Sequence, residues 1–223
     1  MPTPLPWSPS ALSDYKNCPQ QYYRKRVVKD VKDEGGEALH WGNKVHKAFE
    51  LYVKEGKPLP DMLKEHQRML DVLAEMGTER WTERKIALGR DLKPCAYFAD
   101  NVFYRAVIDY TSIHGCQATI VDYKTGKKKP DFTQLKLNAI WIFAEYPHVT
   151  AVDTRYYWTK EKNFSREMYT RGEIPRLWDA VVPDLRQYKK SFHDDLWPTK
   201  PSGLCAWCPV RDCKHWKPRP PGR

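Results

Sequence analysis

The helical spacing of apolar residues is clearest in residues 39–54. Val45, Phe49 and Tyr52 fall on one stripe of this segment, with polar residues around them. Residues 61–76 show the same spacing. Both segments therefore predict helices with one apolar face.

Near the start of the chain, residues 8–28 also have helix-compatible spacing. Ser8 is suited to cap a helix and Pro9 to occupy its first turn. Cys18-Pro19 interrupts the pattern, so the segment predicts two short helical pieces.

Between residues 79 and 123 the helical spacing gives way to short runs of β-branched and aromatic residues. Gly89, Pro94 and the His114-Gly115 step separate these runs and are suited to turns. The pattern predicts three antiparallel strands, within residues 80–88, 95–113 and 117–124.

The rest of the chain alternates between segments with helical spacing and segments with a strand-type pattern. Residues 131–146 predict a helix, residues 149–159 a strand, and residues 173–192 a helix kinked near Pro183. This order indicates an α/β or α+β core flanked by helices. The length of 223 residues fits one domain, and we expect residues 1–223 to form it.

Composition points to a polyanionic partner. The net charge is +10, and an aromatic content of 13% is too high for a disordered basic tail. The first residues do not resemble a signal peptide, and the longest apolar runs, such as residues 139–144, are too short to cross a bilayer. We therefore expect a soluble, intracellular protein that does not associate with membranes.

Asp122 and Lys124 end one of the predicted strands. Residues two apart on a strand point to the same face, so these charges project together while Val121 and Tyr123 face the other way. A hairpin would bring Asp109 near Asp122, and paired carboxylates repel unless a cation joins them. Oxygen ligands suit magnesium or manganese. The alternative is a weak ion pair on an exposed strand.

Five short motifs follow one another in the order and approximate spacing of a known family. They occupy residues 42–50, 83–88, 104–110, 121–128 and 134–139. The set resembles the RecB-like branch of the PD-(D/E)XK nuclease superfamily, and the similarity extends over about residues 8 to 213. It implies a restriction-endonuclease-like core, with a mixed central sheet flanked by helices.

The resemblance also implies roles for individual residues. Lys124 would be the catalytic lysine, acting with Asp109 and Asp122, and Gln134 would position the lysine or a DNA phosphate. The resemblance also implies that the site holds a single divalent ion, Mg²⁺ or Mn²⁺. Its implied ligands are His46, Asp109, Asp122 and the backbone carbonyl of Tyr123, with Glu50 and Glu83 as supporting acids. Without the resemblance, His46 and Glu50 form an ordinary pair on a helix surface.

Two positions depart from the family pattern. Ala106 stands where a glycine is common, and Asn138 replaces a tyrosine four residues after Gln134. The second change puts in doubt whether this helix contacts DNA in the usual way.

Four of the six cysteines form a pattern. Cys205, Cys208 and Cys213 lie close together, and Cys18 would complete a four-thiolate site if the two ends of the chain meet. Physical chemistry leaves zinc and a [4Fe–4S] cluster open, and the same four residues could instead be reduced thiols of the core. Resemblance to iron–sulfur nucleases, including those of CRISPR adaptation and those associated with helicases, favours the cluster. Residues 8–30 and 200–216 would form the cluster-binding element, Cys95 and Cys116 would serve packing, and residues 217–223 would be a mobile basic tail.

Together these features predict a metal-dependent deoxyribonuclease that cuts without sequence preference. The expected mode is exonucleolytic, on single-stranded or end-containing DNA in recombination, repair, CRISPR adaptation or phage genome processing. The chain has no Gly-rich nucleotide-binding motif, so unwinding would need a helicase or recombination partner. The expected location is the cytoplasm of a bacterial, archaeal or phage-infected cell. A non-catalytic DNA-binding scaffold, or a phosphodiester hydrolase acting on RNA or small substrates, are the alternatives.

Overall fold

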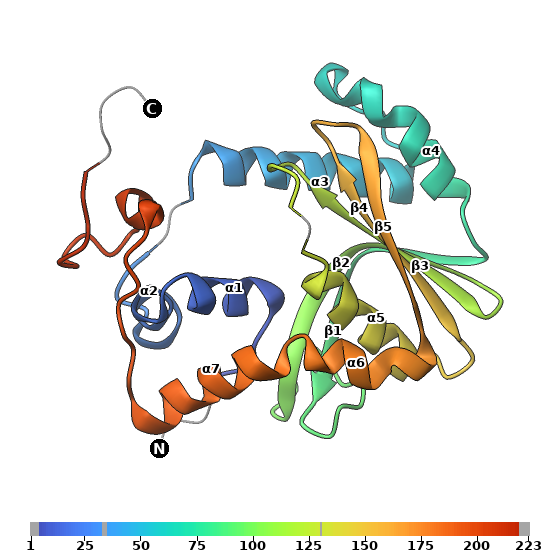
Figure 1. The fold of residues 1–223 in the computed structure, drawn as a ribbon. Coiled ribbons are helices and arrows are strands. Elements are labelled where there is room, and N and C mark those ends of the chain that lie inside the picture. Colours follow the sequence, from blue (N-terminus) through green and yellow to red (C-terminus); the bar gives the residue numbers. More distant parts are fainter. Residues whose placement is uncertain (1–4, 33–34, 130, 219–223) are drawn as a thin grey trace. The chain divides into compact units, whose positions relative to one another are not determined.

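The strand-forming runs predicted between residues 79 and 159 form one mixed sheet (Figure 1). The computed structural model describes residues 5–32, 35–129 and 131–218. Its chain divides into a unit of residues 35–180, which contains the sheet, and a second unit, which combines residues 5–32 with residues 181–218. Residues 219–223, most of the tail expected to be mobile, lie outside the described residues.

The sheet has five strands in sequence order, and only one neighbouring pair is parallel. The first three strands form an antiparallel meander, as predicted, whereas residues 95–101 lie in turns outside the second strand. The third and fourth strands pair in parallel, and the fourth and fifth pair antiparallel. The strands are β1 (Glu79–Gly89), β2 (Val102–His114), β3 (Gln117–Lys124), β4 (Ala151–Trp158) and β5 (Asn163–Thr170).

The edge strand β5 does not follow from the sequence pattern. Tyr169 is its single buried residue, and five of the other seven residues are exposed, among them the apolar Phe164 and Met168. Its sequence therefore lacks the alternation of apolar and polar residues that marks a half-buried strand. The hydrogen bonds to β4 hold β5 in the sheet, and these do not depend on its side chains.

Helices cover both faces of the sheet. On one face, α3 (Glu37–Glu55) and α4 (Gln67–Glu75) bury Val45, Phe49, Leu70 and Leu73 against Tyr110, Val121 and Tyr123. On the other, α5 (Thr133–Glu145) packs through Asn138 and Trp141, which bond to Tyr104 and to the carbonyl of Ala87. The helix predicted at 61–76 begins as a 3₁₀ helix (Asp61–His66) before α4.

The kinked helix predicted over residues 173–192 is two separate helices. These are α6 (Ile174–Asp179) and α7 (Val182–Asp194), and Pro183 occupies the first turn of α7. A proline is tolerated in a first turn because its missing N–H would have no partner in the helix. Pro183 therefore marks a start where the sequence pattern predicts a kink.

The second unit is built on aromatic side chains. Its helices are α1 (Pro9–Asn17), α2 (Pro19–Tyr22), which continues as a π-helix (Tyr23–Val28), and α7, followed by a 3₁₀ turn (Gly203–Trp207). Tyr22 and Tyr188 share a hydrogen bond of 2.6 Å, and Trp197 stacks on Tyr22 and Tyr23. Helices α1 and α2 confirm the two short helical pieces predicted on either side of Cys18-Pro19.

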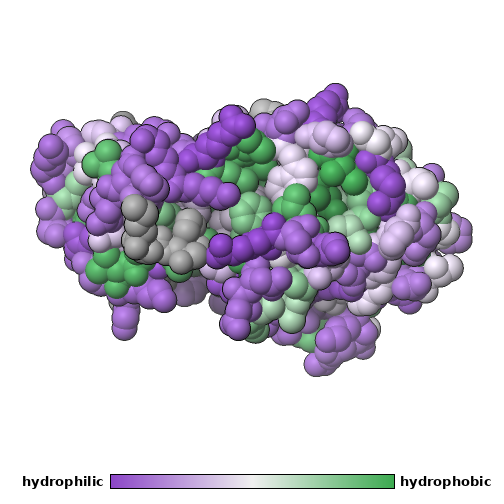
Figure 2. Space-filling model, turned by 90° about the horizontal axis from the view of Figure 1, so that it is seen from below, coloured by the Kyte–Doolittle hydropathy of each residue, from purple (hydrophilic) through white to green (hydrophobic). Residues whose placement is uncertain are grey.

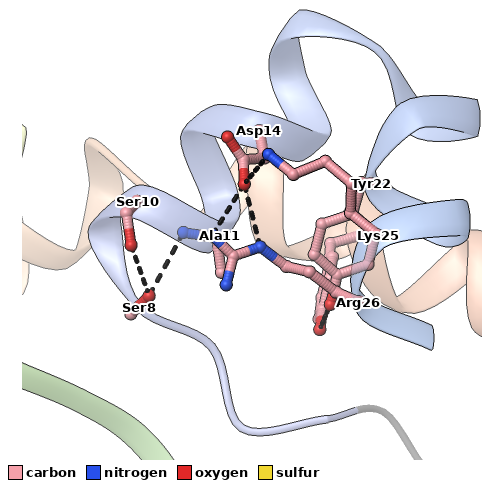
Figure 3. A network of polar contacts seen from close by, with 8 residues as sticks. Ser8, Ser10, Ala11, Asp14, Tyr22, Lys25 and Arg26 are labelled. Carbon is pink, nitrogen blue, oxygen red and sulfur yellow. Dashed lines mark hydrogen bonds and ion pairs between the residues drawn. The ribbon is translucent and has the colours of Figure 1, made fainter. Parts of the chain in front are cut away.

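Polar contacts fix the start of this unit (Figure 3). Ser8 caps α1 by accepting a hydrogen bond from the Ala11 N–H at 3.1 Å, as its position predicts. Asp14 accepts two hydrogen bonds from Arg26 of the π-helix, at 2.9 and 2.6 Å, and lies 3.6 Å from the Lys25 ammonium. These pairs join α1 to the π-helix.

The surface is predominantly hydrophilic in the view of Figure 2, with apolar residues in small separate areas. Within the described residues, no helix combines the length and apolarity that crossing a bilayer requires.

Candidate active site

A break in strand alternation shapes the β1 edge of the sheet. Trp81 and Arg84 are three residues apart on β1, yet both pack against the C-terminal part of α5: Trp81 against Tyr146, and the Arg84 guanidinium 4.8 Å from the Trp141 ring centre. Strand residues three apart normally face opposite ways. Glu83 lies between them with a left-handed φ of 49°, and this local turn of the backbone reverses the alternation.

β2 shows the same reversal. Tyr104 bonds to Asn138 of α5, whereas Tyr110, an even number of residues later, lies in the core beneath α3 and α4. The pairs Thr82↔Tyr110 and Arg84↔Ile108 flank the break and set Glu83 opposite Asp109. The reversal of alternation in β1 and β2 therefore places Glu83 and Asp109, two acids from neighbouring strands, opposite each other in the sheet.

β2 and β3 separate at the same level. Their pairing ends at Tyr110↔Val121, so the next residues, Asp109 and Asp122, lie at the point of divergence. The Asp109 carboxylate accepts a hydrogen bond of 2.7 Å from the Tyr123 N–H, which the ladder no longer uses. This bond fixes the Asp109 side chain, which is only 7% exposed.

His46 reaches this point from α3. Its Nδ1 atom lies 3.3 Å from an Asp109 oxygen and 3.9 Å from a Glu83 oxygen. One ligand atom from each of these three residues lies within 4.8 Å of the other two, a grouping suited to a metal ion. The structure thus brings together two predicted ligands, His46 and Asp109, with Glu83, for which the sequence implied only a supporting role.

Asp122 and Lys124 project from the same face of β3, as the alternation predicts, and they form a closed set with Gln134. The Lys124 ammonium lies 2.7 Å from Asp122 Oδ2 and donates to Gln134 Oε1 at 2.9 Å. Gln134 Nε2 donates to Asp122 Oδ1 at 2.5 Å. Each of the three groups therefore holds the other two in place, and Asp122 lies beside the His46 group.

Several pKa values in the site are raised. Burial acts to lower the pKa of His46, but the hydrogen bond and charge of Asp109, with the charges of two further acids, raise it to about 9. Burial and the charge of Asp109 raise the pKa of Glu83 to about 7. Burial also raises the pKa of Asp122, against the opposing charge of Lys124. Without a cation the site therefore retains protons that a metal ion would displace.

Glu50 lies at the edge of the site. Its carboxylate pairs with Lys47 at 2.7 Å and is 4.0 Å from Lys54, both on α3. Its negative charge contributes to the raised pKa of Glu83. The structure therefore places Glu50, whose side chain is 14% exposed, in an ion pair with the exposed Lys47, and its charge acts on the site.

The two departures from the family pattern are both buried. Asn138 is fully buried and accepts a hydrogen bond of 3.0 Å from the Tyr104 hydroxyl. A side chain in this position faces the sheet and has no access to DNA. Ala106, 7% exposed, pairs with Ile86 in the β1–β2 ladder.

The four patterned cysteines lie together in the second unit. Cys18, Cys205, Cys208 and Cys213 line one cavity of about 230 Å³ and form no disulfide. Backbone N–H groups bond to sulfur: that of Lys200 to Cys18 at 3.4 Å and that of Ser202 to Cys205 at 3.3 Å. Burial and the other three thiols raise the pKa of Cys208, while a backbone hydrogen bond from Val210 opposes the rise.

Comparison with known proteins places this geometry in context. A family model described as "PD-(D/E)XK nuclease superfamily" matches residues 6–103 and 91–213. A solved structure from Eubacterium rectale, named "Putative exonuclease", has 12% sequence identity and a TM-score of 0.59 over 96% of this chain and 90% of that one. This similarity shows a shared fold. No curated protein matches the sequence significantly.

Two further structures resemble the chain more weakly. SSO0001 has a TM-score of 0.48 at 11% identity, over 97% of this chain and 90% of that one. LHK-Exo in complex with dAMP has a TM-score of 0.41 at 12% identity, over 83% and 89% of the two chains.

Proposed function

Because the chain belongs to the PD-(D/E)XK nuclease superfamily, we propose that it is a divalent-metal-dependent deoxyribonuclease that cuts DNA without sequence preference. The observation that carries this is the convergence of His46, Glu83 and Asp109 beside the bonded set of Asp122, Lys124 and Gln134. A fold has no structural need to gather three acids whose charges repel.

The residues fit a hard divalent ion. His46, Asp109 and Glu83 offer one nitrogen and two carboxylate groups, and Asp122 and the Tyr123 carbonyl would complete the ligand set. A Mg²⁺ or Mn²⁺ ion bound there would lower the pKa of a water and neutralise charge on a phosphate.

Lys124 and Gln134 prepare the reaction geometry. The Lys124 ammonium is held by Asp122 and Gln134, so it can orient an attacking water and stabilise charge that develops on phosphorus. Gln134 holds Asp122 and Lys124 in one orientation, since it donates to the first and accepts from the second. The ordering is complete before substrate binds.

Binding through the DNA backbone accounts for the lack of sequence preference. Exposed Lys127, Lys128 and Lys129 follow the catalytic strand directly, and such charges contact phosphates without reading bases. An exonucleolytic mode rests on the resemblance of the motifs to RecB-like iron–sulfur nucleases. A role in recombination, repair, CRISPR adaptation or phage genome processing, in the cytoplasm and with a partner that unwinds DNA, would follow from that mode.

The four cysteines would hold a [4Fe–4S] cluster, with zinc as the alternative. Their shared cavity and their N–H···S hydrogen bonds support a metal group bound by thiolates, and the resemblance of the motifs to iron–sulfur nucleases favours the cluster. Its proposed role is structural, because it would tie the N-terminal helices to residues 200–216.

Cleavage of end-labelled DNA tests the proposed function. Single-stranded and duplex DNA, with RNA as a further substrate, are incubated with the protein in Mg²⁺, Mn²⁺ or EDTA. We expect metal-dependent cleavage of DNA, and Lys124→Ala should slow it by about 10²–10⁴-fold while DNA affinity is retained. Lys162→Ala, which alters a surface ion pair with Glu65, is the matched control. Binding without cleavage under every condition would favour the scaffold alternative.

A further inference from the structure

The connection between β1 and β2 presents an aromatic side chain to solvent. Phe98 is 75% exposed, more than any other large apolar side chain of the described residues. A single exposed apolar residue is common on protein surfaces. Phe98 is different because a lysine ammonium and a second aromatic ring contact it in a defined arrangement.

Two cations flank two rings here. The Lys85 ammonium lies 5.7 Å from the centre of the Tyr97 ring and 5.9 Å from that of Phe98. The Arg105 guanidinium lies 5.4 Å from the Tyr97 ring centre, and the two rings meet edge to face at 5.0 Å. Contacts at these distances are attractive and limit the motion of the rings. We call Lys85, Tyr97, Phe98 and Arg105 the aromatic–cation patch.

The two cations of the patch lie on the same two strands as Glu83 and Asp109 of the candidate active site, and its two rings lie in the connection between those strands. Lys85 is two residues from Glu83 on β1, about 7 Å along the strand, and Arg105 is four residues from Asp109 on β2, about 14 Å along it. Lys85 pairs with Val107, so Lys85 and Arg105 share a face. In this part of the sheet the opposite face packs on α5 through Tyr104. The patch therefore lies on the side of the sheet from which His46 approaches.

We propose that the aromatic–cation patch is a stacking site for unpaired bases of the DNA strand that enters the active site. This inference rests on the proposed function and names its substrate class as DNA with a single-stranded portion. The exposed face of Phe98 offers a stacking surface, and Lys85 and Arg105 offer positive charge to the adjacent phosphates. Bases inside a duplex are already stacked on one another and cannot reach the ring. The patch therefore selects single strands.

The test measures DNA affinity with cleavage switched off. Fluorescence anisotropy compares a labelled single strand with a blunt duplex, for full-length Lys124→Ala protein in buffer without added divalent ions. Adding Phe98→Ala should weaken single-strand binding by about five- to a hundredfold and leave duplex affinity within about twofold. Met62→Ala, which removes a side chain 68% exposed in the same unit, should change neither affinity.

Two further measurements keep the outcome unambiguous. Phe98→Trp should retain single-strand affinity, and a strand carrying 2-aminopurine should lose its fluorescence change with Phe98→Ala, provided circular dichroism shows an intact fold. Equal single-strand affinity of the Phe98→Ala and parent proteins would overturn the inference. So would a Phe98→Ala effect confined to self-association, measured by sedimentation. Either result would leave the cleavage assays, and hence the nuclease function, untouched.

Discussion

Gln134 is the residue that holds Lys124, the proposed catalytic lysine, in its position beside Asp122. It contacts both Asp122 and Lys124, which are two residues apart on β3, from a separate element, α5. We expect Gln134→Ala to lower kcat by about tenfold or more with little change in KM, because it removes positioning and no substrate contact. Steady-state cleavage of a labelled strand in Mn²⁺ measures both constants.

Lys136→Ala, two residues further along α5, is the matched control and should leave kcat near that of the wild type. A Gln134→Ala enzyme with unchanged kcat would show that Lys124 is held by Asp122 alone.

The titrating groups of the site predict how metal affinity depends on pH. His46, with a pKa of about 9, and Glu83, with a pKa of about 7, hold protons in the metal-free protein below those values. A metal ion must displace them, so affinity rises with pH. We expect Mn²⁺ affinity to rise about tenfold per pH unit between pH 7 and 9, to approach a hundredfold per unit below pH 7, and to level off above pH 9.

Calorimetric Mn²⁺ titrations in buffers of different ionisation enthalpy count the released protons. At pH 8 the wild type should release about one proton, and His46→Ala fewer. Affinity that is constant from pH 6 to 9 would mean that these two groups do not bind the ion.

At the scale of elements, the left-handed residue in β1 is the feature that forms the site. Glu83 takes a φ of 49°, a conformation that costs a non-glycine residue about 1 kcal/mol. We expect Glu83→Gly to unfold with a free energy about 1 kcal/mol higher than Glu83→Ala, since both remove the carboxylate and only glycine relieves the backbone. Urea unfolding of the metal-free proteins measures the difference.

Equal stabilities of the two variants would show that the turn at Glu83 carries no strain. Both variants should lose cleavage activity, because each removes a carboxylate from the group around His46.

Elements differ in how far their sequence defines them. The stripe of Val45 and Phe49 specifies α3, because a buried face imposes its own period. In β5 only Tyr169 is buried, so this strand depends on its pairing with β4, and the sequence of β5 does not predict a strand. Pro183 disfavours a continuous helix, but whether it kinks one helix or starts another is decided by the residues before it.

At the scale of the whole molecule, the cysteines connect distant parts of the chain. Cys18 and Cys208 line the same cavity although they are 190 positions apart in the sequence, so a metal group bound to both would close a long loop of the chain. We expect Cys208→Ser to yield poorly soluble protein with reduced iron and sulfide content, measured by elemental analysis and visible absorption.

Cys95→Ser is the control, because Cys95 does not line that cavity, and it should keep the full metal content. Zinc in place of iron, in protein purified without oxygen, would identify the alternative metal. A soluble Cys208→Ser protein with full metal content would contradict the four-cysteine site.

The sequence alone determined the helices and strands with a buried face, the family, and the residues able to carry the chemistry, since each depends on local spacing and side-chain type. Tertiary structure decided which of those residues meet. The place of Glu83 beside His46 and Asp109 depends on one backbone angle and on the divergence of two strands. Periodicity cannot show either, because both arise from contacts between residues far apart in the chain.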